Sequence, residues 1–175
     1  MRARYPFLLF VFVAGTAFSG EPSGRIADLQ PELKQALVRD DSCVKSADRA
    51  QATGELQSPV TTQEILSAGH EAGVIAAPQD DCHCRNGNCS TFVYLKSGEA
   101  YKLAFKDSFA SLRPMKVIKH GLPSLSGKFQ LSQQQEETTI YDWSGRDYEA
   151  SLCATVTQRE HQRLPSISQH PCKKK

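Results

Sequence analysis

The fold is decided by residues 91–105, which read TFVYLKSGEAYKLAF. Residues 91–95 are β-branched and aromatic, as is typical of a strand. After a break at Ser97-Gly98, residues 99–105 alternate, with Tyr, Leu and Phe expected on one face and Ala, Lys and Ala on the other. A two-residue break that contains Gly, between two such runs, predicts a β-hairpin.

Working outward, further short apolar or alternating runs predict strands at 73–76, 115–119, 128–131, 138–143 and 148–153. The last two flank Ser144-Gly145-Arg146 and are expected to form a second hairpin. Between the strands, polar residues predict exposed loops at 120–126 and 133–137. Residues 158–171 are polar and contain two prolines, so we expect a tail that lies on the surface.

One helix is expected near the N-terminus. Residues 28–38 place their apolar side chains on one face, at Leu29, Leu33, Ala36 and Leu37. Pro31 suits the first turn of such a helix. Residues 43–63 are polar and aperiodic. The fold class predicted is therefore mainly β, with antiparallel sheets of hairpins, one short N-terminal helix and disulfide cross-links.

The first residues are typical of a secretory signal peptide. Arg2 and Arg4 are basic, residues 6–14 form an apolar run, and Ala17 and Ser19 are small residues suited to cleavage after residue 19 or 20. The apolar run is shorter than the roughly 20 residues that a membrane span needs. The chain is thus divided into a signal peptide (1–19), a helix with a polar loop (20–63), a core of β-hairpins (64–157) and a polar C-terminal tail (158–175).

Charge narrows the function classes. The 175 residues include 21 Lys and Arg against 19 Asp and Glu, and the mean hydropathy of −0.43 excludes a protein with many membrane spans. Removing Arg2 and Arg4 with the signal leaves 19 basic residues, equal to the 19 acidic ones. The exported part is then neutral, so a nucleic-acid partner is not expected, nor is stable membrane insertion.

All six cysteines follow the expected signal, at Cys43, Cys82, Cys84, Cys89, Cys153 and Cys172. An even number of cysteines in an exported chain of this size predicts disulfides, although six allow fifteen pairings. Because alternate residues of an extended chain point the same way, a bond between Cys82 and Cys84 is disfavoured. One of them is expected to bond Cys89 and the other a distant cysteine, and Cys172 is expected to bond the body of the protein.

Two other interpretations of residues 82–89 remain open. Cys82, His83, Cys84 and Cys89 offer the thiolates and imidazole that suit zinc, although their spacing is not that of a standard zinc knuckle. A redox-active pair is the third interpretation, but a thioredoxin-like site needs C-x-x-C at the start of a helix. We therefore expect no cofactor and no resident metal.

Several motifs resemble a loosely defined group of small exported bacterial proteins. They are CHCRNGNCSTFVY at 82–94, the G-x-P-x-L step at 121–125, and YDWSGRDY at 141–148 followed by Cys153. The group has a C-H-C-G-x-x-N-C-x-x-W-V-Y-like element, a G-Y-x-D-L-like step and a final hairpin of similar pattern. The resemblance spans about residues 74–153.

The chain departs from this group at two positions, with Phe92 where Trp is frequent and Ser124 where Asp is frequent. The group has no established activity, so the resemblance implies fold and export only. In form, the Cys84-x4-Cys89 spacing is also similar to the loop that some periplasmic lysozyme inhibitors insert into an enzyme cleft. The interior at 85–88 lacks the His of that family's loop, and His83 lies just outside it.

Catalytic motifs give no support for an enzyme. The five histidines do not form H-E-x-x-H, and neither G-x-S-x-G, a P-loop nor G-x-G-x-x-G occurs. We therefore expect a periplasmic protein-binding module that inhibits, or gives immunity against, a peptidoglycan amidase or lysozyme. Its expected binding residues are Arg85, Asn86, Asn88, His120, Ser124 and Ser126.

Two alternatives remain from other function classes. One is a metal-binding or hydrolytic envelope protein that uses the region of Cys82, His83 and Cys84. The other is a structural envelope protein without an enzyme partner.

Overall fold

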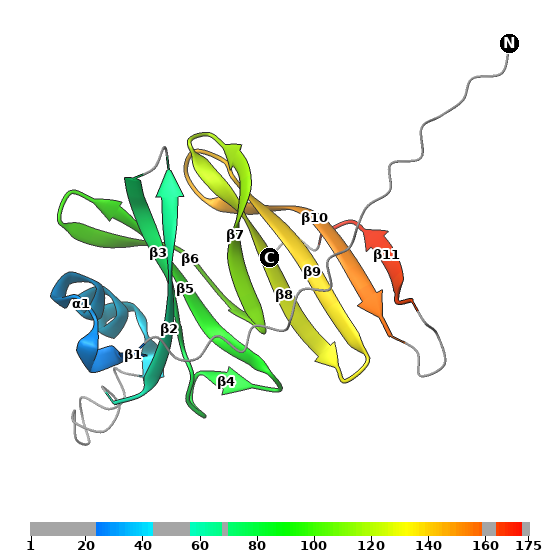
Figure 1. Ribbon diagram of the computed structural model, residues 1–175, viewed down its shortest axis with the longest axis horizontal. Helices are drawn as coiled ribbons and strands as arrows, with labels where there is room; N and C mark the ends of the chain where they lie inside the picture. The colour runs from blue at the N-terminus through cyan, green and yellow to red at the C-terminus, as the bar shows by residue number, and fades with distance from the viewer. Residues whose placement is uncertain (1–23, 44–56, 68–69, 159–163, 173–175) are drawn as a thin grey trace, which may run out of the picture.

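The computed structural model describes residues 24–43, 57–67, 70–158 and 164–172 (Figure 1). Within them the protein is mainly β and antiparallel, with one α-helix, as predicted. The expected signal peptide at 1–19 lies outside the described residues.

The elements follow one another in the order β1 (Gly24–Arg25), a 3₁₀ turn (Ile26–Asp28), α1 (Pro31–Asp40), β2 (Pro59–Ser67), β3 (His70–Pro78), β4 (Cys84–Arg85), β5 (Asn88–Ser97), β6 (Ala100–Phe109), β7 (Ser111–Lys119), β8 (Leu122–Ser132), β9 (Gln135–Trp143), β10 (Tyr148–Thr157) and β11 (Ser166–His170). They form two sheets. The N-terminal sheet has the order β1-β2-β3-β5, with both β4 and β6 also paired to β5. The C-terminal sheet is a meander of β7 to β11, in which each strand pairs with the next.

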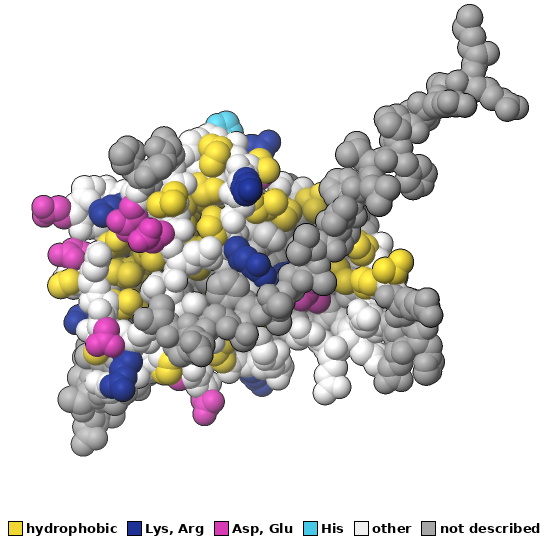
Figure 2. All heavy atoms as spheres, viewed as in Figure 1, with side chains coloured by type: hydrophobic (Ala, Val, Ile, Leu, Met, Phe, Trp, Pro, Cys, Tyr) yellow, Lys and Arg dark blue, Asp and Glu magenta, His cyan; other side chains and the backbone are white. Residues whose placement is uncertain are grey.

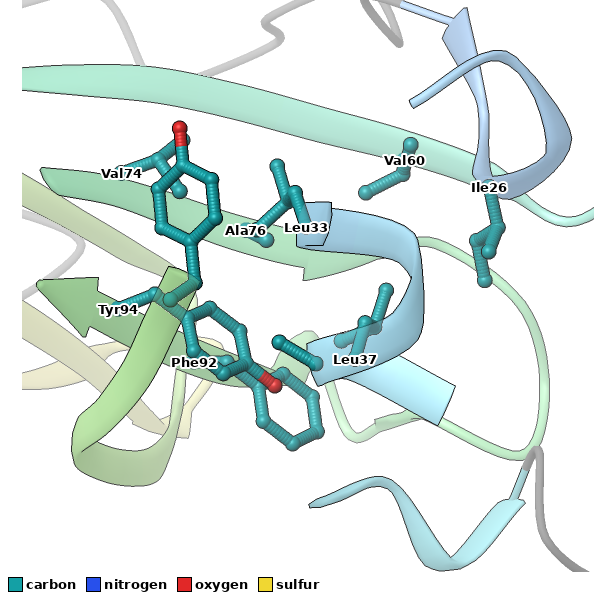
Figure 3. Packing of buried hydrophobic residues seen from close by; sticks show 10 residues of the cluster. Ile26, Leu33, Leu37, Val60, Val74, Ala76, Phe92 and Tyr94 are labelled. Atoms are coloured by element: carbon teal, nitrogen blue, oxygen red, sulfur yellow. The ribbon is translucent and has the colours of Figure 1, made fainter. Parts of the chain in front are cut away.

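The N-terminal sheet is the middle of three layers, with α1 on one face and the C-terminal sheet on the other (Figure 1). On the helix side, Leu33 and Leu37 of α1 pack against alternate residues of the sheet, which include Phe92 and Tyr94 of β5 (Figure 3). Pro31 begins α1 and Glu32 lies in its first turn, where a carboxylate favours the helix dipole. The helix predicted at 28–38 is therefore confirmed, shifted by two to three residues toward the C-terminus.

The opposite face of the N-terminal sheet contacts the C-terminal sheet. Ile75 and Val93, neighbours of the helix-side residues along β3 and β5, turn to this face and pack against Leu125 and Tyr141. Phe105 and Phe109 complete an aromatic cluster, with the Phe105 and Tyr141 rings 4.8 Å apart. Because β5 is buried on both faces, its residues Phe92, Val93 and Tyr94 form an uninterrupted run of large apolar side chains.

The expected alternation in β6 is wrong at one position. Leu103 pairs with Tyr94 and Phe105 with Val93, so Ala104 is an extra residue in the ladder. This β-bulge reverses the side-chain alternation. Tyr101 therefore packs in the helix-side cluster, whereas Phe105 packs between the sheets.

Three segments expected to be loops or tail are strands instead. Residues 122–126 lie in β8, residues 135–137 begin β9, and residues 166–170 form β11 against β10. Residues 135–137 and 166–170 are polar because they are exposed or only partly buried, and β11 is the edge strand of its sheet. Residues 122–126 differ, because β8 is an interior strand and Pro123, Ser124 and Leu125 are buried. Nine-residue β2 also crosses the boundary expected at residues 63 and 64.

The disulfides expected from the sequence are present, and the structure decides the pairings that the sequence left open. Cys84 bonds Cys89, Cys82 bonds the distant Cys43, and Cys172 bonds Cys153 in β10. Three disulfides indicate an exported protein in an oxidising compartment. The described part of the chain contains no helix that is long and apolar enough to cross a membrane.

Gly127 of β8 permits the close approach of the two sheets. A Cβ atom built there would lie 2.5 Å from Cε1 of Phe109 and 3.2 Å from Cε2 of Tyr141. We predict that Gly127→Ala lowers the free energy of unfolding by about 1–3 kcal/mol, since the buried rings must shift. Urea unfolding measures the loss.

Gly24→Ala is the matched control, because a Cβ there meets no atom closer than 3.9 Å. Equal unfolding midpoints for the two variants would contradict this account of the sheet packing.

Candidate functional site

A buried histidine lies between two carboxylates at the base of α1. Nε2 of His83 is 2.5 Å from Oδ2 of Asp41, and Nδ1 is 2.6 Å from Oδ1 of Asp80. Asp41 and His83 are 2% and 5% exposed. Ionised carboxylates only accept hydrogen bonds, so a ring placed between two of them favours the imidazolium form, in which both nitrogens donate, and the raised pKa of His83 agrees with this. We call these three residues the Asp–His–Asp cluster.

Two opposing effects set the charge of this cluster. Burial lowers the pKa of His83, but the hydrogen bonds to Asp41 and Asp80 and the charges of both outweigh it, so the pKa is raised. Burial raises the pKa of Asp80, but hydrogen bonds from Ser58 and His83 outweigh it, so the pKa is lowered. Both shifts favour the ion-paired form.

Local sequence positions each member. Asp41 follows α1, and its N–H donates to the carbonyl of Leu37, which anchors it under a buried residue. The Asp80 carboxylate accepts the N–H groups of Cys82 and His83 at 3.0 and 3.1 Å, so it holds its own turn closed. The His83 carbonyl accepts the N–H of Ser90, which fixes the turn on β5.

The next residues form a tight hairpin closed by the Cys84–Cys89 disulfide. Asn86 and Gly87 both have positive φ, 51° and 77°, and Cys84 pairs directly with Cys89 across the ladder. Asn-Gly is the sequence that this two-residue turn favours. Arg85, Asn86 and Gly87 are exposed, and the Arg85 side chain pairs with no residue that the structure describes. We call residues 84–89 the disulfide turn.

Asn88 ties the disulfide turn to the C-terminal sheet. Its Nδ2 donates to the Gln130 carbonyl at 2.9 Å, and its Oδ1 accepts the Gln130 N–H at 2.7 Å. The turn therefore lies beside the end of β8, where Phe129 and Leu131 are 37% and 47% exposed. The exposed β8–β9 turn at Gln133-Gln134 follows directly.

The structure separates the six expected binding residues. Arg85 and Asn86 are exposed on the disulfide turn, whereas Asn88 is only 5% exposed. Ser124 is 1% exposed, and its hydroxyl donates to Asp142, so neither Asn88 nor Ser124 offers a side chain to a partner. The expected placement of these two residues on an exposed surface is therefore wrong.

The other two expected residues lie elsewhere. His120 is exposed in the β7–β8 turn with a φ of 48°, and Ser126 is partly buried in β8. In Figure 1 the β7–β8 turn is at the upper end of the molecule and β4 is at the lower end. Because these two turns lie at opposite ends of the molecule, we expect a partner to contact one of them and not both.

Several important residues were missed from the sequence. Asp41 and Asp80, the two carboxylates that contact His83, are not among the binding residues predicted from the sequence. The Asp80-x-x-His83 spacing is a usable signal, because an Asp side chain often bonds the backbone two or three residues on. Asp41 gave no signal, since its partner His83 lies 42 residues away.

The surface charge in view does not favour a partner of either sign. Figure 2 shows Lys and Arg side chains on the same face as Asp and Glu side chains, so both signs are interspersed there.

Searches against protein-family models, curated proteins and solved structures found no match to this chain.

The Asp–His–Asp cluster predicts a pH dependence of stability in the oxidised protein. Because the pKa of His83 is raised above its ordinary 6.5, its contribution is complete below pH 6.5 and is lost as pH rises through the raised value. The lowered pKa of Asp80 gives a contribution that is complete above pH 3.8 and is lost at lower pH. We predict that stability falls from pH 6.5 toward 9, and that His83→Asn removes this fall.

At pH 6, His83→Asn should also cost about 3–5 kcal/mol, because it leaves buried charge unpaired. His120→Asn, on an exposed turn, is the matched control and should keep the wild-type profile. Urea unfolding between pH 5 and 9 in the presence of a chelator measures both. An unchanged profile in His83→Asn would contradict the prediction.

Proposed function

We propose that this protein is an exported, periplasmic protein-binding module that blocks a cell-wall-degrading enzyme, either a peptidoglycan amidase or a lysozyme. One observation carries the proposal: the disulfide turn is exposed at its tip and fixed at its base. Arg85 and Asn86 project from it, while the Cys84–Cys89 bond and Asn88 hold the backbone.

Rigidity supports a role in binding. A loop that must be ordered on binding loses about 0.5–1.5 kcal/mol for each immobilised side chain. Here the turn is closed covalently, bonded to β8 on one side and continuous with the His83 turn on the other. The backbone of the turn is therefore already ordered on folding, so binding has to order only the exposed side chains of Arg85 and Asn86.

The chemistry of the tip suits a hydrolase cleft. Enzymes that cleave glycosidic bonds place two carboxyl groups in the cleft. A guanidinium with no partner among the described residues is complementary to such a pair, and it binds carboxylate in a bidentate manner. Phe129 and Leu131 beside the tip supply exposed apolar area, and Gln133 and Gln134 supply a polar border.

The first prediction of this proposal concerns Arg85. The purified protein should inhibit the loss of turbidity of a peptidoglycan suspension by one member of a panel of lysozymes and amidases. Arg85→Ala should weaken that inhibition about 30-fold or more, as expected for a central arginine. Lys119→Ala, at the far end of β7, is the matched loss of a positive charge and should leave inhibition unchanged.

Capture of the same enzyme from periplasm on immobilised protein is the second readout. If no enzyme of the panel is inhibited and no peptidoglycan hydrolase is captured, the proposal is wrong. Equal effects of the two variants would place the contact outside the disulfide turn.

The second prediction concerns preorganisation. The double variant C84S/C89S keeps Arg85 and Asn86 but opens the turn, so we expect about tenfold weaker binding from added ordering cost. C153S/C172S also removes one disulfide, at the β10–β11 edge, and should bind as the wild type does. Surface plasmon resonance with the inhibited enzyme measures both, and equal losses would contradict a specific role for the closed turn.

A further inference from the structure

A second site, independent of the proposed inhibition, lies where α1 meets the His83 turn. A carboxylate oxygen of Asp41, Sγ of Cys43 and a ring nitrogen of His83 all lie within 4.8 Å of one another. Cys82 Sγ adds a fourth donor, since it is bonded to Cys43 Sγ at 2.04 Å. We propose that reduction of the Cys43–Cys82 disulfide converts this cluster into a zinc site formed by Asp41, Cys43, Cys82 and His83.

The donor set fits zinc better than other common divalent ions. Two thiolates, one imidazole and one carboxylate match the tetrahedral S, N and O coordination of Zn²⁺. With bonds of about 2.0–2.3 Å, neighbouring donor atoms in a tetrahedron are about 3–4 Å apart. Asp41, Cys43 and His83 already place donor atoms within 4.8 Å of one another, so these three need only small side-chain movements, and Cys82 Sγ would join them once the S–S bond is broken.

Asp80 already occupies the supporting position of such a site. Ligating histidines commonly donate their second ring N–H to a carboxylate, which orients the ring and strengthens the ligand. Nδ1 of His83 lies 2.6 Å from Asp80, which leaves Nε2 directed at Asp41, where the ion would bind. Backbone N–H groups of Cys82 and His83 hold Asp80 in turn.

Access favours this disulfide for reduction. Cys82 is exposed, whereas Cys84 and Cys89 are partly buried and Cys153 is 4% exposed. Disulfide exchange needs approach to a sulfur atom, so attack begins at Cys82.

Thiol–disulfide exchange with an external dithiol reduces the Cys43–Cys82 disulfide. A thiolate of an external dithiol attacks Sγ of Cys82, the S–S bond breaks, and Cys43 leaves as a thiolate. The second thiol of the dithiol then attacks the mixed disulfide and releases Cys82, so two electrons and two protons pass from the dithiol to the protein. Zn²⁺ then displaces the two thiol protons and the proton that Nε2 of His83 directs at Asp41.

The proposed ion replaces one cross-link with another. In the oxidised chain the Cys43–Cys82 bond joins the end of α1 to the turn before β4. In the reduced chain, zinc would bridge the same two segments through ligands from each. Zinc should therefore stabilise the reduced protein, and increasingly so as the free zinc concentration exceeds the Kd, because only the folded chain brings the four ligands together.

The test uses the full chain, oxidised or reduced with a phosphine under argon. Zn²⁺ is titrated in competition with a chromophoric chelator, and native mass spectrometry counts bound ions. We expect one Zn²⁺ per reduced chain and none per oxidised chain. Co²⁺ should give thiolate-to-metal absorption and the strong visible bands of tetrahedral coordination. Absence of metal binding by the reduced chain overturns the proposal.

Three double variants locate the site, since each removes one disulfide and two thiols. C43S/C82S should lower zinc affinity at least 100-fold, while C84S/C89S and C153S/C172S should bind one Zn²⁺ as the wild type does. Asp80→Asn should weaken binding about 10–100-fold and leave the stoichiometry unchanged. Equal affinities for the three double variants would indicate unspecific thiolate binding and would also overturn the proposal.

Discussion

The whole structure depends on burial of β5 on both faces. Phe92 and Tyr94 anchor α1 on one side, and Val93 anchors the C-terminal sheet on the other. A slip of one residue in β5 would exchange these two sets and leave both outer layers without their contacts. The pairing with β3 and β6 fixes the register, and the bulge at Ala104 adapts β6 to both clusters.

Around this strand, a disulfide and buried polar contacts join elements in addition to the apolar core. The Cys43–Cys82 bond and the Asp–His–Asp cluster join α1 to the turn before β4, and Asn88 joins β5 to β8. These links meet within residues 80–88, which span the connection from β3 to β5 and the first residue of β5. The same connection presents Arg85 and Asn86 to solvent, so the proposed binding residues lie on a segment that a disulfide, an ion pair and side-chain hydrogen bonds hold in place.

Local patterns in the sequence were enough for part of this structure. The β5–β6 hairpin, the helix and the exclusion of a Cys82–Cys84 bond follow from neighbouring residues, and the structure agrees with them. Which of these two cysteines bonds Cys89 was left open by the sequence, and the structure assigns that bond to Cys84. The bulge at Ala104 and the strand character of residues 122–126 depend on partner strands, which no local pattern reveals. The contact between Asp41 and His83 forms only in the tertiary fold. The buried Ser124 hydroxyl likewise finds its hydrogen-bond acceptor, Asp142, on another strand. The proposed binding tip was visible in the sequence, but its polar support was not.

β4 lies between β3 and β5 along the chain, but β3 and β5 pair directly in the sheet, which has an evolutionary consequence. β3 and β5 pair through residues 73–76 and 92–95, so the register of the sheet is set without residues 85–87. Changes at the tip therefore leave the hydrophobic core untouched, provided that the cysteines, Asp80, His83 and Asn88 remain. The frame is thus suited to diversification at Arg85, where one stable scaffold can acquire new binding specificities, while the positive φ of Asn86 and Gly87 restricts those two positions to residues that tolerate it.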